Sequence, residues 1–308
     1  MQKKVLQIFS LFVFASFIGS QFVPYTSFVD KWAVSVAHAD GNKKKSKKKG
    51  DGIQHLWEYK KKHFNLYAKN DDIRIGEHYM GLQIKAFKRD DKGVDLPKHR
   101  ELKTRIEKIV SRLAAVSDEP NFPYEVHIFD KPDVVNAFCM PGGKIGVFTG
   151  LFDEKKGLVD INNDDQIAAV LGHEMAHATL RHATRQATSM QGLGFLGTVA
   201  SVALGQGVGA EAQVIFNRVF NIGANLYLPS YSRKHEAEAD QVGFYYMSKA
   251  RFNPIAAVDI WQKAASRGGP NSKKTDFFAS HPASGERAHR LKKWLPEAEG
   301  IKNGTIAR

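Results

Sequence analysis

The chain has 308 residues, which is enough for one large domain or two small ones. Hydrophobic residues make up 43% and charged residues 25% of it, a composition that is ordinary for a globular protein and excludes a wholly disordered or fibrous chain. The formal net charge is +13. The single cysteine, Cys139, excludes an intramolecular disulfide and is expected to be a small buried hydrophobe without a catalytic role.

The N-terminal segment has the pattern of an export signal. Lys3 and Lys4 form a positively charged start, a strongly apolar stretch runs from Val5 to Ile18, and Ala37-His38-Ala39 offers a small-x-small cleavage site. Residues 5–29 contain no charge and are long enough to span a bilayer, so an uncleaved anchor is the competing interpretation. Polar residues within that stretch favour cleavage. We therefore expect residues 1–39 to be a signal peptide (or N-terminal anchor), and the exported remainder to lie in the periplasm or at the extracytoplasmic face of the membrane.

Residues 40–65 are predicted to be a Lys-rich linker with a leading helix, and Lys43–Lys49 contains six lysines. Such a run can contact anionic lipid headgroups or nucleic acid, but a solvated, disordered tether is the favoured interpretation, and we expect no nucleic-acid partner. The Gly-rich apolar segment 191–228 is a second candidate for contact with a membrane surface, or else a buried helical hairpin. Its glycines and the charges of Glu211 and Arg218 argue against a spanning helix.

The following segments predict helices around a small sheet. A charged helical pattern runs from Ile53 to about Lys88, and an amphipathic helix is predicted over Leu102–Val116. Tyr124–Phe129 alternates like a strand, and Asn136–Leu151 has the pattern of a hairpin that turns at Pro141-Gly142-Gly143. The chain from Arg233 onward is predicted to be mostly helical.

The most informative motif is His173-Glu174-Met175-Ala176-His177. Cap and first-turn residues at Asn162–Asp165 favour a helix start, and no Pro or Gly except Gly172 interrupts the sequence from Gln166 to Met190. Residues four apart share a helix face, so the two histidines can bind one metal ion while Glu174 lies beside it and takes a proton from a water. The alternative is two helix histidines with solvent or core partners. Gly172 is a poor helix former, which a closely packed neighbouring backbone would explain.

A catalytic zinc needs a third protein ligand and an open position for water. Glu236 can complete the site, and Asp240, one turn later, can accept a hydrogen bond from the free ring nitrogen of a ligand histidine. An ordinary exposed acidic turn is the alternative for this pair. Glu238 lies off this face and is expected to point to solvent. His182 and His235 also lie off the ligand faces, so we expect a structural role for His182 and no ligand role for His235.

The order of these motifs resembles the M48 metallopeptidases. The resemblance rests on the His-Glu motif, on the segment from Tyr231 to Asp240, on the hairpin around Pro141–Gly143, and on Asn253-Pro254. It covers roughly residues 66–295. It implies an α+β fold that is mostly helical, with a zincin-like metallopeptidase domain over 66–300, a small β-sheet or hairpin beside the active-site helix, and a tail over 301–308.

The resemblance also implies roles for individual residues. His173, His177 and Glu236 would bind one zinc ion per chain, with Glu174 as general base and later proton donor, and Asp240 orienting a ligand. His281 and Arg287 match the family's His-Pro segment and the Arg that follows it; the histidine would either stabilise the oxyanion or cap the zinc in a latent state. The strand from Lys144 would be the sheet edge on which a peptide substrate pairs, and the expected substrate-binding residues are Asn136, Lys144, Ile145, Gly146 and Val147.

The predicted function is a zinc-dependent endopeptidase of the cell envelope that hydrolyses peptide bonds of unfolded or misassembled proteins as quality control. One alternative is an envelope chaperone or assembly factor whose zinc site is largely latent. Another is a surface-tethered adaptor that works through Lys43–Lys49.

Overall fold

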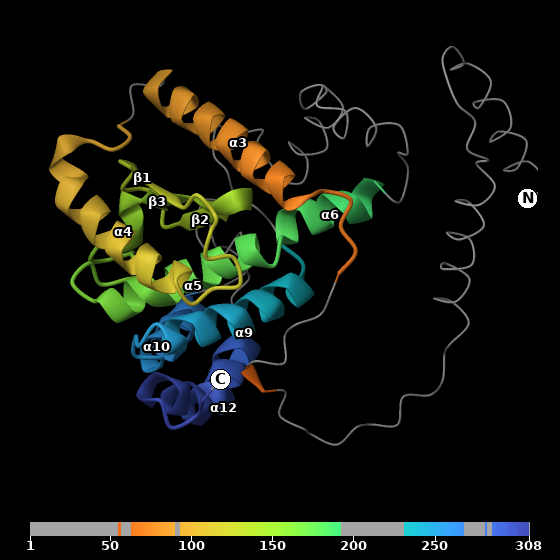
Figure 1. The fold of residues 1–308 in the computed structure, drawn as a ribbon. Helices are drawn as coiled ribbons and strands as arrows, with labels where there is room; N and C mark the ends of the chain where they lie inside the picture. Colours follow the sequence, from red (N-terminus) through yellow and green to blue (C-terminus); the bar gives the residue numbers. More distant parts are fainter. Residues whose placement is uncertain are drawn as a thin grey trace, which may run out of the picture. The chain divides into compact units, whose positions relative to one another are not determined.

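The computed structural model describes residues 55–56, 63–89, 93–191, 231–267, 281 and 285–307. The predictions for residues 1–39, for Lys43–Lys49 and for 192–228 lie outside these ranges. Figure 1 shows the described elements, which are, in chain order, α3 (Lys69–Arg89), η2 (Pro97–His99), α4 (Arg100–Ala114), β1 (Glu125–Phe129), β2 (Ala137–Met140), η3 (Pro141–Gly143), β3 (Lys144–Phe148), η4 (Thr149–Phe152), α5 (Asp164–Thr179), α6 (His182–Gln191), α9 (Arg233–Lys249), α10 (Ile255–Arg267) and α12 (Gly285–Asn303).

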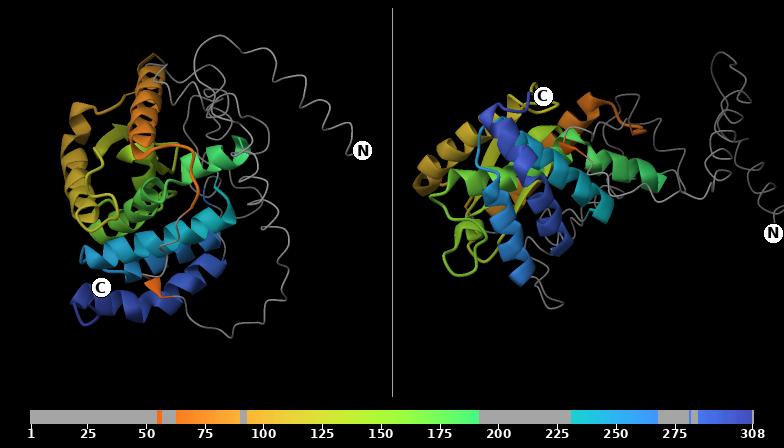
Figure 2. Two further views of the ribbon diagram at one scale, coloured as in Figure 1. Left: turned by 45° about the vertical axis from the view of Figure 1, so that its right-hand side comes forward. Right: turned by 90° about the horizontal axis from the view of Figure 1, so that it is seen from below.

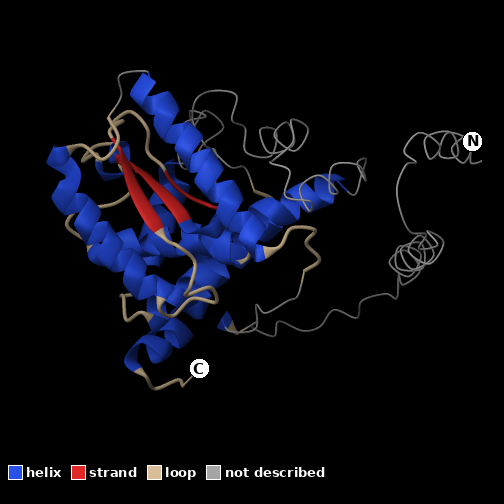
Figure 3. Cartoon of the chain, turned by 45° about the horizontal axis from the view of Figure 1, so that its top comes forward, coloured by secondary structure: helices blue, strands red, loops and turns tan. Residues whose placement is uncertain are grey.

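The small sheet lies between helices on both of its faces. Its strand order is β1-β3-β2, with β1 parallel and β2 antiparallel to β3. Figure 3 shows the strands with helices on either side. Phe129, Phe138 and Phe148 pack with apolar residues of α3, whereas the strand residues Val126 and Val147 belong to the core formed with α4 and α5. The predicted class, a mostly helical α+β fold with a small sheet beside the His-Glu helix, is confirmed.

The predicted hairpin is present, but β3 is not its free edge. β3 pairs with β1 on one side and with β2 on the other, so its backbone donors and acceptors are used within the sheet. The expectation that the strand near Lys144 to Thr149 is an edge of the sheet is therefore wrong, and the pairing of a substrate with the sheet stays a prediction. Of the two outer strands in the described part of the chain, β2 is the one that packs against α5.

The helix of the His-Glu motif, α5, begins and packs as the sequence predicts. The side chain of Asn163 accepts a hydrogen bond from the amide of Gln166, 3.1 Å away, and so caps the helix. Gly172 lies against Gly243 of α9, where a Cβ on Gly172 would be 3.0 Å from the Gly243 carbonyl and a Cβ on Gly243 would be 2.7 Å from the His173 amide nitrogen. Two glycines therefore let the backbones of α5 and α9 touch beside the first histidine.

Two helix boundaries differ from the expected pattern. The expected pattern runs from Ile53, but α3 begins at Lys69 and the described residues 63–68 before it are not helical; Leu56 is fully buried in the core. The uninterrupted pattern from Gln166 to Met190 is divided into α5 and α6 at Arg181, whose φ is +58°. The Arg181 side chain bonds to Asp72 and, at 2.6 Å, to the Tyr67 carbonyl, so tertiary contacts hold a conformation that ends α5.

The C-terminal helices form a layer on the side of α5 that faces away from the sheet (Figure 2). Within this layer α9 contacts α5 and α12, and α10 contacts α5 and α12. α12 ends at Asn303, and Ile301 is buried in the core. No helix among the described residues is long and apolar enough to cross a membrane.

Candidate metal centre

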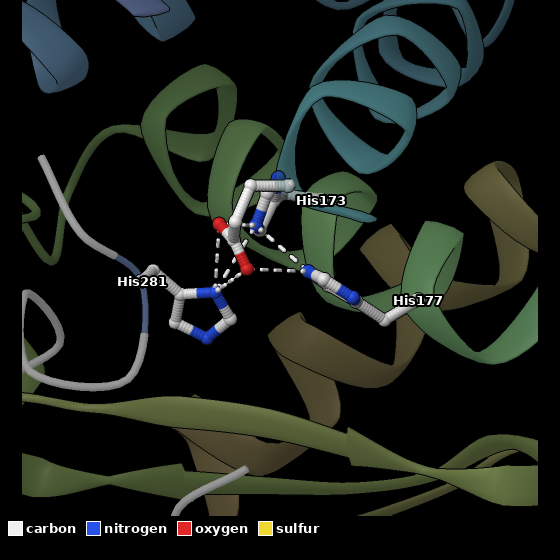
Figure 4. Close-up of side chains that lie close together, drawn as sticks. His173, His177 and His281 are labelled. Atoms are coloured by element: carbon white, nitrogen blue, oxygen red, sulfur yellow. Dashed lines mark hydrogen bonds and ion pairs between the residues drawn. The ribbon is translucent and has the colours of Figure 1, made fainter. Parts of the chain in front are cut away.

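Three separate parts of the chain bring four potential metal ligands together. α5 supplies His173 and His177, the first turn of α9 supplies Glu236, and His281 comes from just before α12. Ser232 caps α9 by accepting a hydrogen bond from the His235 amide, which places Glu236 within the first turn. Figure 4 shows the three imidazole rings facing one another.

Five of the six pairs of side chains in this group have donor-atom distances that fit one tetrahedral metal ion. His173 Nε2 lies 3.1 Å from His177 Nε2 and 3.3 Å from His281 Nδ1. The Glu236 carboxylate lies 3.4 Å from each of the two α5 imidazoles and 3.1 Å from His281 Nδ1. A tetrahedral zinc ion with bonds of about 2.0–2.1 Å separates its ligand atoms by roughly 3.3–3.4 Å. The four side chains therefore have the spacing that a shared zinc ion requires.

Burial and charge also suit a cation at this point. All four side chains are buried, and burial lowers the pKa of His177, which keeps the imidazole neutral and able to coordinate. Burial alone would raise the pKa of Glu236, but the neighbouring His281 and His173 hold it well below its usual range. A neutral imidazole and an ionised carboxylate are the forms in which these groups bind zinc. The donor set fits the predicted cofactor.

Asp240 and Arg287 support the cluster from the α9 and α12 side. Asp240 Oδ1 lies 3.2 Å from His173 Nδ1, and Arg287 donates to both Asp240 oxygens at 3.0 and 2.6 Å. Burial would lower the pKa of His173, but the hydrogen bonds to Asp240 and Glu236 raise it to about 9. Arg287 also lies 2.8 Å from Glu236 and stacks on Trp261 of α10 at 3.7 Å from the ring centroid. The structure thus brings Asp240 and Arg287 next to the candidate ligands, whereas no local pattern pointed to Trp261.

Glu174 has the environment expected of a general base. Its side chain is buried, neither carboxylate oxygen accepts a hydrogen bond from the described residues, and burial raises its pKa. A carboxylate whose pKa moves toward neutrality accepts a proton more effectively near pH 7. His281 Nε2 lies 3.3 Å from Glu174 Oε1, so the ring of His281 reaches both the ligand cluster and the base.

Glu238 corrects one expectation, and His182 lies closer to the candidate ligands than the sequence indicated. Glu238 does not point to solvent: its side chain is 17% exposed and binds Arg185 at 2.8 Å and His182 Nε2 at 3.2 Å. His182 is fully buried, and its Nδ1 lies 2.8 Å from Nδ1 of the ligand His177. Burial lowers the pKa of His182 to about 3, which leaves it neutral. His235 does not join the ligands and stacks on His182, with ring centroids 4.4 Å apart.

The expected substrate-binding residues lie in the sheet and have partners there. Ile145 and Val147 are fully buried in the core, and Gly146 faces the ring of Phe138. Lys144 Nζ bonds to the Pro123 carbonyl at 3.1 Å and to Glu125 at 3.2 Å. Asn136 is buried, and its side-chain oxygen accepts a hydrogen bond from the Ala137 amide. A role for these side chains in holding a substrate stays a prediction.

Residues 100–295, which include the whole cluster, match the sequence profile of Peptidase family M48. The chain belongs to this family. The resemblance seen in the sequence is confirmed, as are the zincin-like fold and the metallopeptidase type of site. The M48 match also includes His281 and Arg287, which the fold places against His173 of α5.

Several metallopeptidases are similar to this M48 chain. Mitochondrial metalloendopeptidase OMA1 of Schizosaccharomyces pombe is 33% identical over 207 residues, which cover 66% of this chain and 56% of the relative. Metalloprotease LoiP of Escherichia coli is 29% identical over 213 residues, 69% of this chain and 78% of the relative. The beta-barrel assembly-enhancing protease of Yersinia pestis is 26% identical over 180 residues, 58% of this chain and 35% of the relative. The match spans little more than half of the fission-yeast relative's length.

Proposed function

We propose that the chain is a zinc-dependent endopeptidase that hydrolyses peptide bonds of unfolded or misassembled proteins of the cell envelope. The observation that carries the proposal is the buried cluster of His173, His177 and Glu236 with Glu174 beside it. Similarity to a bacterial metalloprotease and to a beta-barrel assembly-enhancing protease supports protein substrates. The signal-like pattern of residues 1–39 supports export, although other relatives are named as mitochondrial.

The chain's own residues have separable tasks in this reaction. A zinc ion held by His173, His177 and Glu236 would acidify a water molecule and polarise the scissile carbonyl. Glu174 would accept the proton of the attacking water and later deliver it to the leaving amine. Arg287 places a fixed positive charge beside the cluster, where it can stabilise developing negative charge.

The substrate would pair with the outer edge of β2 rather than with β3. β2 is an outer strand and packs against α5, so a peptide added along it would lie near the metal ligands. Main-chain hydrogen bonds to such an edge bind peptides with little demand on their sequence, which suits a peptidase of unfolded proteins.

The direct test is Glu174→Gln in the purified protein. We expect hydrolysis of an unfolded protein substrate to fall by a factor of about 10² or more, because the base is lost while the zinc ligands are intact. Zinc content, measured by atomic emission, should equal that of the wild type.

Glu154→Gln, which makes the same change in an exposed loop residue, is the matched control and should retain full activity. Equal cleavage rates for Glu174→Gln and the wild type, at equal zinc content, would show that the proposal is wrong.

A latent form of the same centre is the second candidate, and His281 favours it. His281 Nδ1 lies 3.3 Å from His173 Nε2 and 3.1 Å from Glu236, so it would occupy the fourth position that a catalytic site keeps for water. Its Nε2 also covers Glu174. In this arrangement the centre resembles a closed structural site, which suits a chaperone or assembly factor that cleaves only after the histidine is displaced.

Substitution of His281 separates the two roles that this residue can have. If His281 caps the metal, only the chains in which this histidine is displaced can cleave a substrate. His281→Ala should then raise the cleavage rate, by a factor equal to one divided by the fraction of wild-type chains in that displaced state. If it stabilises the oxyanion instead, the same change should lower the rate. His99→Ala, which alters a histidine bound to Asp130, controls for unspecific effects. Prevention of aggregation by Glu174→Gln at the wild-type level would support the chaperone role.

A further inference from the structure

His182, the first residue of α6, is not one of the candidate ligands but contacts one of them, His177. In a continuous α-helix, His182 would be rotated about 140° from His177, because five residues turn the helix by about 500°. The break at Arg181 changes this: its φ of +58° redirects the chain and brings His182 Nδ1 to 2.8 Å from His177 Nδ1. The contact joins the metal ligand to a fully buried histidine.

The hydrogen-bond partners of the two imidazoles determine which ring nitrogen of each carries the proton. His177 faces the metal position with Nε2, since that atom lies 3.1 Å from His173 Nε2 and 3.4 Å from Glu236. Its proton must then be on Nδ1, which donates to His182 Nδ1. His182 can accept only if its own proton is on Nε2, and that nitrogen lies 3.2 Å from the Glu238 carboxylate, which can accept it.

We propose that His182 and Glu238 form a positioning relay that holds His177 in the tautomer whose Nε2 lone pair faces the metal. The proposal deepens the proposed function, because it concerns the same metal centre. His182 is a positioning residue: it acts on the metal only through His177. The far end of the relay is anchored, since Arg185 holds Glu238 at 2.8 Å and His63 lies 3.7 Å from its other oxygen.

Ring stacking adds a second constraint to the relay. His177 is stacked on Tyr231, with centroids 4.0 Å apart and an interplanar angle of 14°. His182 is stacked on His235, with centroids 4.4 Å apart and an angle of 16°. The planes of both imidazoles are thus held while the hydrogen bonds fix their protons. The two α5 ligands are supported differently, because His173 meets the carboxylate of Asp240 directly and His177 reaches a carboxylate through another imidazole.

The test measures zinc affinity and proton position in the purified full chain, without any proteolysis assay. Zinc alone is titrated against a competing chelator for the wild type, His182→Leu, His182→Asn and Glu238→Leu. We expect His182→Leu to raise the zinc dissociation constant by about 10–100-fold, the usual effect of removing a partner that orients a ligand. His182→Asn should recover most of the affinity, because its amide oxygen can take the place of Nδ1 as an acceptor. Glu238→Leu should weaken binding by a smaller factor.

His99→Leu is the matched control, because it breaks a histidine–carboxylate pair, His99 with Asp130, outside the metal centre. Its zinc affinity should equal that of the wild type. In the metal-free chain with ¹⁵N-labelled histidine, the nitrogen spectrum should show His177 protonated at Nδ1 in the wild type and in His182→Asn. In His182→Leu it should show a mixture of tautomers.

Zinc affinity of His182→Leu within about twofold of the wild type, with an unchanged His177 tautomer, would overturn the relay. If His182→Leu does not fold, Glu238→Leu decides instead: wild-type affinity together with an unchanged His177 tautomer overturns the relay. The outcomes are distinct from those of the proteolysis test. The relay can fail in a chain that cleaves proteins normally, and it can hold in a chain whose Glu174→Gln variant shows that the proposed reaction is wrong.

Discussion

Arg287 links three of the helices around the metal centre through its side-chain contacts. It comes from α12, donates to Asp240 and Glu236 of α9, and stacks on Trp261 of α10. Its guanidinium is the charge that balances these two buried carboxylates when no metal ion is bound. Arginine suits this place because its planar fork can bond to a carboxylate with two nitrogens while its face rests on an aromatic ring.

Removing that charge should destabilise the metal-free protein. We expect Arg287→Gln to lower the free energy of unfolding by about 3–5 kcal/mol, because it leaves buried carboxylates without a counter-charge. Arg287→Lys should restore only part of the loss, since an ammonium group cannot bond to Asp240 through two fixed nitrogens. Denaturant titration of the chelated proteins measures the effect.

Arg290→Gln provides the comparison, because Arg290 also bonds to Asp240, at 3.1 Å, but its side chain is 33% exposed. Its loss should be about 0–1 kcal/mol, as for other pairs near the surface. Equal losses for the two arginines would contradict the assignment of Arg287 as the central counter-charge.

At the scale of elements, the crossing of α5 and α9 sets the distance between the first histidine and Glu236. Gly172 and Gly243 make that crossing close, and any side chain on Gly243 would meet the backbone at His173. The glycine in the motif helix therefore has a packing function, as the sequence suggested. The second glycine could not be recognised as its partner, because the two lie on different helices.

Gly243→Ala should force the two helices apart. We expect a loss of about 1–3 kcal/mol in the free energy of unfolding, typical of overpacking, and a weaker zinc affinity, because His173 moves relative to Glu236. Thermal unfolding with and without zinc measures both effects.

The same substitution at Gly81, in α3, has the opposite expected sign. A Cβ there meets nothing within 4 Å, so Gly81→Ala should stabilise the protein by about 1 kcal/mol through helix propensity. If Gly243→Ala, like Gly81→Ala, lowered neither the free energy of unfolding nor the zinc affinity, the close crossing of α5 and α9 would not determine the geometry of the metal centre.

Local sequence patterns predicted the helices and strands better than the tertiary contacts between them. The ligands on α5 and α9 were predictable because a spacing of four residues fixes a shared helix face wherever the helix lies. His182 was not recognised as a partner of His177 because Arg181, which follows α5, is an ordinary helix former, and its side-chain contacts with Asp72 and Tyr67 come from a distant part of the chain. The central position of β3 was hidden for a similar reason, since the parallel pairing with β1 is set by the tertiary fold.

At the scale of the whole molecule, the metal centre ties together parts of the chain that are far apart in sequence. Two potential ligands come from α5, one from α9, and one is His281. A ligand that binds only the folded state stabilises it in proportion to the logarithm of its concentration, and zinc at a hundred times its dissociation constant adds about 2.7 kcal/mol.

Chelation should therefore lower the midpoint of thermal unfolding. We expect a decrease of about 5–10 °C for a domain of this size, reversed by added zinc. A variant with both His173→Ala and His177→Ala serves as the control and should unfold at the same temperature with or without chelator. A wild-type midpoint that does not respond to chelator would contradict a zinc ion shared among these segments.

The place of His281 has a further consequence for inhibition. A hydroxamate or similar zinc-binding inhibitor needs a free coordination position, and His281 would occupy that position if it caps the metal as proposed above. Such a compound would bind only after the His281 ring has moved out of that position. Inhibition would therefore develop slowly, and its rate constant would reach a plateau as the inhibitor concentration rises. The plateau value would then equal the rate constant with which His281 leaves that position in the absence of inhibitor.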